Sequence, residues 1–500
     1  MSNNLNIAES TNYEQKATFP PKYKPQRLFQ NSSGTTVSIN TNGPASAVFD
    51  LPAGVVFNLA KSYLRGQLDV FGNAAGATCQ SLFTDIPPIT RALLESRNST
   101  PLADIQYFQD VWKMTSNLIT PTEVFNSYPS IGVGVTDAFS QVNGVCLFNN
   151  PSNSGIGTPP NASALAAAAG SPGLFATKIA APAGAGGIPI VDDLSIGRKN
   201  YQSQQQYVTT GAGNVGDATN NNSLYWQLNF DKIPFSIFSL NRDIYTTESL
   251  RLTFDFAPVS AIGFNHAAVA TLVGGTNLDQ NTPATMTNVN LYLAIEQNPV
   301  IVEEVKNKVL SSGLSFTYPY PIILKQGLGA TQNASATFKF TKSYGQRLLR
   351  VITAESLTSN SNVTRCCFYN WANPLPYITG TYRTTLNSTQ LQDETIDESK
   401  GDGYRYNAQK LKGCPLENLV EYYTQCPCNI DDWSAADKMI DAPEADLQMC
   451  GISLENEQIY GKIITKNPYN ANTYYDTTMT AIGVVQRTLT LGPYGVTVRT

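Results

Sequence analysis

Histidine is almost absent from this 500-residue sequence, whose single histidine is His266. A histidine-based zinc site is therefore excluded by count. A serine or cysteine hydrolase would have to use His266 as its base, and no G-x-S-x-G segment supplies a matching nucleophile. We therefore expect His266 to be a loop or packed histidine. The sequence predicts no enzyme, and we assign no catalytic residue, cofactor or metal ligand.

Charged residues are also scarce, at 14% of the chain against about 25% in an average globular protein. The net charge is −5, whereas a surface that coats nucleic acid needs clustered lysine and arginine. Specific nucleic-acid binding is therefore not expected. Basic residues gather only near the N-terminus, where Lys16, Lys22 and Lys24 are interspersed with prolines. Residues 1–26 are predicted to be an extended arm, either a solvated tail or a segment that orders on a neighbouring subunit.

Long apolar runs are missing as well. No stretch approaches the roughly 18 apolar residues of a membrane-spanning helix. The opening segment, MSNNLNIAES, lacks the apolar core of a signal peptide. The sequence therefore predicts a protein made inside the cell and not exported by a signal peptide.

The eight cysteines do not form a recognisable ligand pattern. Cys414, Cys426, Cys428 and Cys450 lie close in sequence, but C-P-C differs from the C-x₂-C spacing of zinc sites and no histidine is nearby. Buried free thiols are the favoured interpretation, and a metal site or disulfides remain open.

Two other segments match ligand motifs only weakly. Residues 211–216 fit G-x-G-x-x-G, but a polar loop follows where dinucleotide binding requires a helix N-terminus. The acidic run 393–398, with Asp402 beyond it, lacks EF-hand spacing. A solvated acidic loop is therefore favoured over a calcium site.

What the sequence does contain is strand patterning, divided in two by residues 286–314. The first part of this segment alternates leucine and isoleucine with other residues, as a half-buried strand does. Asn298 can then cap a helix, Pro299 suits its first position, and Gly313 can supply a left-handed stop. Residues 299–313 are thus predicted to be a linker helix between two strand-rich halves.

Each half is predicted to be one β domain with a long insertion. The first domain spans residues 27–298 with a low-complexity insertion at about 128–222, and the second spans 314–500 with an insertion at about 391–450.

Two short echoes suggest that the domains are duplicates. ASAVFDL at 45–51 is matched by ASATFKF at 334–340, and KSY at 61–63 by KSY at 342–344. Short strands, long polar loops and few charges predict an all-β protein of two consecutive antiparallel jelly rolls. A glycan-binding or glycan-hydrolysing β-sandwich is the alternative, supported only by the 25 tyrosines and the loop carboxylates.

Four segments in combination carry a resemblance to a known family: 88–105, 250–264, 292–297 with the helix after it, and 338–350. Together they resemble the double jelly-roll major capsid proteins of icosahedral DNA viruses. The likeness is to the polinton-like virus and virophage type, related to large eukaryotic DNA viruses.

The resemblance implies a structural role in a virion capsid assembled inside the host cell. It implies a homotrimer whose jelly rolls form a pseudo-hexagonal capsomer that tiles an icosahedral shell. The implied partners are neighbouring capsomers, penton and minor capsid proteins, with contact to an internal membrane allowed. The arm at 1–26 would be an inner clamp.

Overall fold

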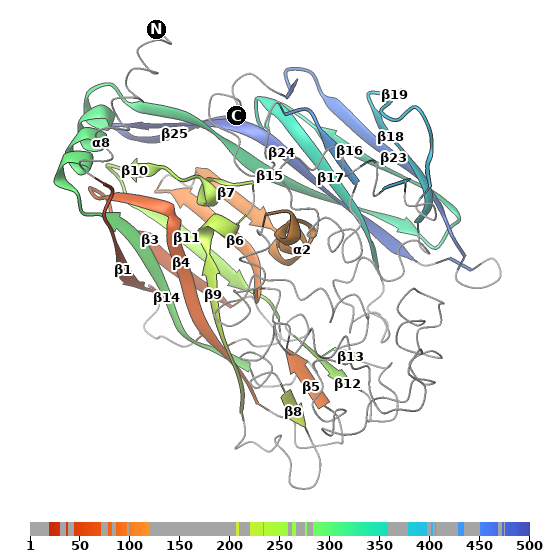
Figure 1. Cartoon of the computed structure of the whole chain (residues 1–500), viewed down its shortest axis with the longest axis horizontal. Coiled ribbons are helices and arrows are strands. Elements are labelled where there is room, and N and C mark those ends of the chain that lie inside the picture. Colours follow the sequence, from red (N-terminus) through yellow and green to blue (C-terminus); the bar gives the residue numbers. More distant parts are fainter. Residues whose placement is uncertain are drawn as a thin grey trace.

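The computed structural model shows two β-sandwich bodies joined by the helix α8 (Pro299–Ser311) (Figure 1). Within the part of the chain that the structure describes, no helix has the length and apolar content needed to cross a membrane. The described residues are 20–30, 37–38, 45–71, 79–82, 87–97, 100–119, 207–209, 221–233, 235–258, 263–266, 276–277, 284–358, 379–397, 402–403, 406, 429–434, 451–468, 473–474 and 476–500.

The first body contains two main sheets and one small outlying sheet. The first main sheet pairs β1 (Tyr23–Phe29), β14 (Ala284–Glu296), β4 (Val56–Phe71) and β10 (Asp243–Tyr245) in that order, with β2 (Val37–Ser38) beside β14 and β9 (Asn221–Asn229) beside β4. The second pairs β3 (Ser46–Leu51), β11 (Leu250–Phe256), β6 (Ile89–Ser96) and β7 (Pro101–Gln106). The small sheet pairs β13 (Thr276–Asn277), β12 (Gly263–His266), β5 (Cys79–Leu82) and β8 (Tyr207–Thr209). It lies at the end of this body away from α8 (Figure 1).

The second body also has two main sheets. One pairs β15 (Leu314–Gly329), β24 (Thr477–Gly492), β17 (Arg347–Leu357) and β21 (Asn429–Asp432), with β22 (Ile452–Ser453) beside β17 and β25 (Gly495–Arg499) beside β24. The other pairs β16 (Asn333–Phe340), β23 (Gln458–Lys466), β18 (Thr379–Leu386) and β19 (Thr389–Gln390), with β20 (Ile396–Asp397) beside β18.

The two bodies share one topology. In chain order, β1, β3, β4, β6, β7, β10, β11 and β14 correspond one by one to β15, β16, β17, β18, β19, β21, β23 and β24, and corresponding strands hold the same place in their sheets. Antiparallel strands in two sheets with this order form a jelly roll. The predicted all-β fold of two consecutive jelly rolls is confirmed.

Only one of the two sequence echoes reflects this correspondence. Residues 45–51 overlap β3 and residues 334–340 overlap β16, which are corresponding strands. The KSY echo does not correspond, because residues 61–63 lie inside β4 and residues 342–344 lie in the turn before β17.

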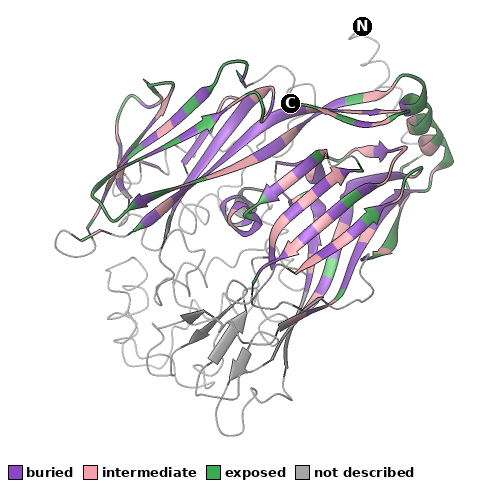
Figure 2. Cartoon of the chain, turned by 180° about the vertical axis from the view of Figure 1, so that it is seen from behind, coloured by how far each residue is buried: buried purple, intermediate pink, exposed green. Residues whose placement is uncertain are grey.

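Period-two patterning builds the core. β11 shows it most plainly: every second side chain is buried, and the residues between them face outward. Buried side chains of both bodies join in one continuous hydrophobic cluster, and Figure 2 shows buried stretches running through both sandwiches. Because each fully buried leucine or phenylalanine contributes about 1.5–3 kcal/mol, these alternating positions determine which face of each strand turns inward. The inward residues of β11 are Leu250, Leu252, Phe254 and Phe256.

The linker helix forms as the sequence predicts. The Asn298 side chain accepts a hydrogen bond from the backbone N–H of Val300 at 3.1 Å, and Pro299 is the first helical residue. Gly313, just beyond the helix, has φ +75°, which a residue with a Cβ rarely adopts. Val309 anchors the helix because its side chain is fully buried.

The first strand begins earlier than the sequence suggests. β1 starts at Tyr23 and so takes in the last residues of the segment predicted as an arm. Pro25 is tolerated there because β1 is an edge strand whose described pairing is with β14 alone. Glu296 holds the entry to the strand, since its Oε1 accepts from the backbone N–H of Lys22 at 2.8 Å.

The two predicted insertions are only partly described. In the first, β8 and the start of β9 are paired, and residues 120–206 and 210–220 lie outside the described residues. In the second, the sequence also predicts a short helix around 432–440. Asp432 instead ends β21, and residues 435–440 lie outside the described residues. The sequence also predicts a strand at 365–371, and these residues lie outside the described part too.

Candidate functional site at the junction of the two jelly rolls

The two jelly rolls meet along two sheet edges. β7 is the last strand of its sheet in the first jelly roll, and it lies against β15, the first strand of its sheet in the second (Figure 1). The helix α2 (Phe108–Ile119) follows β7 directly, and the short 3₁₀ helix η5 (Ile237–Ser239) also contacts β15. Each sheet thus covers an edge of the other, which removes two unpaired strands from solvent.

An ion pair beside an aromatic ring joins α2 to β15. Asp110, in the first turn of α2, pairs with Lys325 of β15. The Nζ of Lys325 also lies 4.0 Å from the centre of the Tyr107 ring. Tyr107 has φ +51°, and its carbonyl accepts from the backbone N–H groups of Asp110 and Val111 at 2.9 and 3.1 Å, so it turns the chain from β7 into α2. Because the two charged side chains are 29% and 19% exposed, the pair is screened and contributes roughly 0.2–1 kcal/mol.

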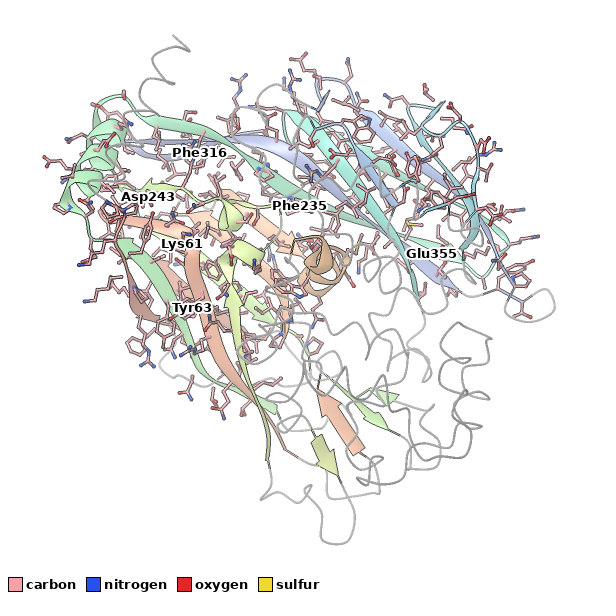
Figure 3. The ribbon with its side chains drawn as sticks, in the orientation of Figure 1. Lys61, Tyr63, Phe235, Asp243, Phe316 and Glu355 are labelled. Carbon is pink, nitrogen blue, oxygen red and sulfur yellow. The ribbon has the colours of Figure 1, made fainter. Side chains whose placement is uncertain are left out.

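Two arginine–phenylalanine contacts cross the junction in opposite directions. The Arg350 guanidinium of β17 lies 5.2 Å from the centre of the Phe235 ring in the first jelly roll. Arg242 of the first jelly roll lies 5.3 Å from the ring of Phe316 on β15, and burial lowers the pKa of this guanidinium. Figure 3 shows both rings between the two bodies. Desolvated contacts of this kind contribute up to about 2 kcal/mol each.

A carboxylate closes the junction near α8. Glu248, in the turn before β11, accepts from the backbone N–H of Val496 at 2.8 Å. The neighbouring Gly495 has φ +121°, and a Cβ there would lie 2.8 Å from Glu248 Oε1. Glycine is therefore required for the carboxylate to reach the backbone. Thr247 adds a hydrogen bond to the carbonyl of Gly492 at 3.3 Å.

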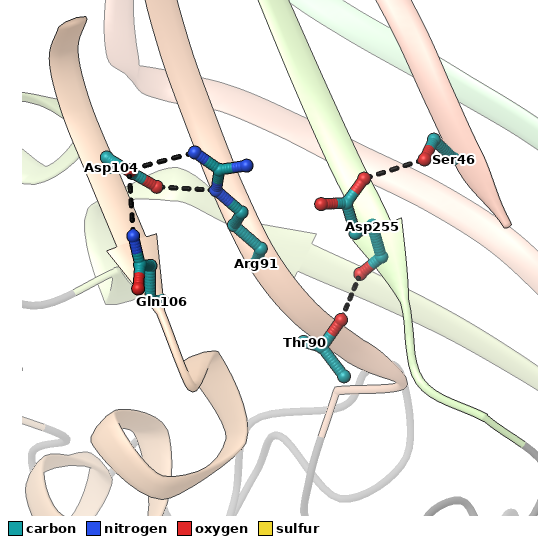
Figure 4. A network of polar contacts seen from close by, with 6 residues as sticks. All are labelled: Ser46, Thr90, Arg91, Asp104, Gln106 and Asp255. Atoms are coloured by element: carbon teal, nitrogen blue, oxygen red, sulfur yellow. Dashed lines mark hydrogen bonds and ion pairs between the residues drawn. The ribbon is translucent and has the colours of Figure 1, made fainter. Parts of the chain in front are cut away.

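A groove of about 510 Å³ opens beside the junction, and Figure 4 shows the hydrogen-bond network around it. Arg91 and Asp104 form a two-point contact at 2.6 and 2.9 Å, and this hydrogen bonding raises the pKa of the Arg91 guanidinium. Asp255 accepts from the Ser46 hydroxyl at 2.6 Å. The carboxylates of the groove are thus engaged by a cation or a hydroxyl. The lining residues are Thr90, Arg91, Gln106, Tyr107, Gln109, Asp110 and Asp255.

A second polar network lies in the core of the second jelly roll. The buried carboxylate of Asp431 accepts from the hydroxyls of Tyr406 and Tyr460, both at 2.7 Å, and from the Asn429 amide at 3.0 Å. Burial, with the adjacent negative charge second, raises the pKa of both tyrosines. A network satisfied in this way rigidifies the core around β21.

The residues that the sequence analysis considered as candidate ligands or catalytic groups either lie away from the junction or fall outside the described part of the chain. His266 ends β12, and its side chain is outside the described part, as are residues 211–216 and the cysteines at 414–450. Of the acidic run, Asp393 and Glu394 are exposed, and β20 follows them. Among the described residues, no group of three or more metal-ligating side chains occurs.

Sequence reasoning did not find the junction residues. Lys325 and Asp110 lie 215 positions apart, so no local spacing signals their pairing. Tyr107 has a positive φ, but a tyrosine in the sequence does not predict a positive φ, as a glycine or asparagine can. The junction can be identified only once the positions of the edge strands in the folded chain are known.

Comparison with solved structures shows the same fold. The VP54 protein of PBCV-1, fitted into a reconstruction of the virophage Sputnik, matches with a TM-score of 0.52 at 9% identity, over 96% of this chain and 97% of that one. A chain of the PBCV-1 virus capsid matches at 0.51 with 10% identity, over 96% and 97%. The Faustovirus major capsid protein matches at 0.51 with 10% identity, over 95% and 91%.

No family model matches the sequence, and no curated protein matches it. The solved structures nevertheless show that the chain has the double jelly-roll fold of viral major capsid proteins. The resemblance seen in the sequence is thus confirmed at the level of fold.

Proposed function

We propose that this chain is a structural major capsid protein, not an enzyme, and that it assembles as a homotrimeric, pseudo-hexagonal capsomer that tiles an icosahedral virus shell. The observation that carries the proposal is the pair of jelly rolls with one shared strand order, held together by a specific junction. Three such pairs supply six similar units for a closed ring. The shared fold with the Faustovirus major capsid protein supports this reading.

In this proposal the chain has four parts: the predicted arm, which ends where β1 begins at Tyr23 and not at residue 26, a first jelly roll that runs to residue 298, a linker at 299–313 and a second jelly roll at 314–500. Its partners are its own copies, neighbouring capsomers, and penton and minor capsid proteins, with contact to an internal membrane allowed. Its place is the virion capsid. The sparse charge of the sequence, 14%, suits a protein with extensive contacts to its neighbours.

The test is the mass and outline of the purified native protein. Light scattering is expected to give the mass of three 54.2-kDa chains, and negative-stain images are expected to show a hexagonal outline. A protein that remains a monomer at high concentration would refute the capsomer.

A monomer would favour the alternative, a glycan-binding or glycan-hydrolysing β-sandwich. The observation behind that alternative is the groove, which places Asp110, Asp255 and the half-exposed ring of Tyr107 on one surface. Saturable binding of an oligosaccharide, abolished by Asp255→Asn, would establish it.

A further inference from the structure

Corresponding edge strands of the two jelly rolls differ sharply in burial. On β15, Phe316, Tyr318 and Tyr320 are at most 5% exposed, because this strand lies against β7 and η5. On β1, the strand with the same place in the first jelly roll, residues 24–27 are all exposed, and Phe29 is 59% exposed. Figure 1 places β1 on the side of the first jelly roll away from the second. One edge is covered within the chain and its counterpart is bare.

The pairing inside the chain indicates what covers the bare edge. The edge at β7 of the first jelly roll contacts the edge at β15 of the second. In a closed ring of alternating first and second jelly rolls, the same contact recurs with the roles exchanged. The counterpart of β7 is β19, and the counterpart of β15 is β1. The edge at β19 of one copy would then face the edge at β1 of the next.

The charges on these two edges are complementary. β1 carries Lys24 and Arg27, both exposed, and has no acidic residue. Asp393 and Glu394, both exposed, follow β19 after Leu391 and Gln392. Within the described part of the chain, no ion pair involves Lys24, Arg27 or either of these acids.

The contact inside the chain has the same chemistry. There, Asp110 in the segment after β7 pairs with Lys325 of β15. An acidic residue that follows the edge strand of one sheet thus contacts a basic residue on the edge strand of the other. The acidic run that resembled a solvated loop in the sequence follows β19 in the same way. Lys325 pairs with Thr480 near the start of β24, whereas Lys24 pairs with Ile295 near the end of the corresponding strand β14. Arg27 is therefore the basic residue of β1 that lies nearer to the place of Lys325.

We infer that the exposed edge of β1, centred on Phe29 and Arg27, is the docking surface for a second copy of this chain, which seats β19 and its Asp393–Glu394 turn against it. This inference rests on the proposed trimer. Arg27 is prearranged for the contact: its guanidinium lies 4.7 Å from the Phe29 ring, and its Nε donates to Asn290 at 3.0 Å. The aromatic ring is the anchor of this surface, and the charges give its register.

The experiment measures the dissociation constant of the full-length oligomer by native mass spectrometry and light scattering over a dilution series. Phe29→Ala is expected to weaken association at least about tenfold, because an interface loses its central aromatic side chain. Arg27→Glu and Glu394→Lys are each expected to weaken it about fivefold or more, and to restore it when combined. Tyr494→Ala is the matched control, because Tyr494 is a fully exposed aromatic in the turn between β24 and β25.

The outcomes separate this inference from the proposed function. A wild-type protein that is monomeric at every concentration refutes the trimer itself. A wild-type trimer whose dissociation constant is unchanged by Phe29→Ala and by the charge reversals overturns the docking surface alone. All three substituted side chains are exposed, and circular dichroism and melting temperature confirm that each variant is folded. Restored association in the combined charge swap establishes direct contact between the two edges.

Discussion

Removing the buried cation at the junction should destabilise the protein strongly. Arg350 and Asp432 form an ion pair at 3.7 Å with side chains only 2% and 8% exposed. Breaking a buried pair by removing one partner costs about 3–5 kcal/mol, because the remaining charge stays buried. Asp432 keeps two hydrogen bonds from Ser434, at 2.9 and 2.6 Å. We therefore expect Arg350→Met to lie near the lower end, at about 3 kcal/mol.

The assay is urea unfolding of the full chain at pH 7 and fixed protein concentration, followed by circular dichroism. Arg350→Lys is the control, since it keeps the charge but not the flat guanidinium over Phe235, and it should lose roughly 1–2 kcal/mol. A double-mutant cycle with Phe235→Leu isolates the contact across the junction. A loss below about 1 kcal/mol for Arg350→Met would refute the account of this pair as buried and interdependent.

Two further perturbations test the second jelly roll. Gly483→Val should lower the melting temperature by more than Gly327→Ala, because a Cβ on Gly483 would lie 2.1 Å from the buried Phe340 ring and Gly327 faces open space. Equal melting temperatures would contradict this packing. Stability should also fall above pH 10, by up to about 1.4 kcal/mol per pH unit for each buried tyrosine whose folded pKa is raised, since the unfolded tyrosine then loses its proton first. Tyr406→Phe should flatten this alkaline loss in denaturant titrations between pH 8 and 11, and an unchanged slope would refute the role of the Tyr406 hydroxyl.

Local signals in the sequence were sufficient for most of the fold. The linker helix follows from Asn298, Pro299 and Gly313, each of which acts within its own turn. β11 follows from strict alternation of apolar side chains. The antiparallel pair β6 and β7 follows from two short strands separated by a turn. In each case the residues that determine the element lie within a few positions of one another, so the local sequence is enough to predict it.

Features that depend on distant contacts could not be predicted. β1 extends into a proline-rich basic segment, because β14 and Glu296 bring the backbone there into register. The KSY echo looked like a second sign of duplication, yet only the strand order shows that it is not. The junction rests on pairs such as Arg242 with Phe316, whose meeting is decided by the placement of whole sheets. No spacing rule in one sequence encodes such a meeting.

The helix α8 has a consequence for the strength of the junction. A short covalent tether holds the two jelly rolls at an effective concentration in the millimolar range. Contacts that would be too weak to join separate chains can therefore hold β7 against β15. The proposed contact at β1 has no such tether, so it would have to draw on greater area or on closure of the proposed ring. A chain cut within α8 would consequently lose many of its junction contacts, although both fragments together still contain every residue of that junction.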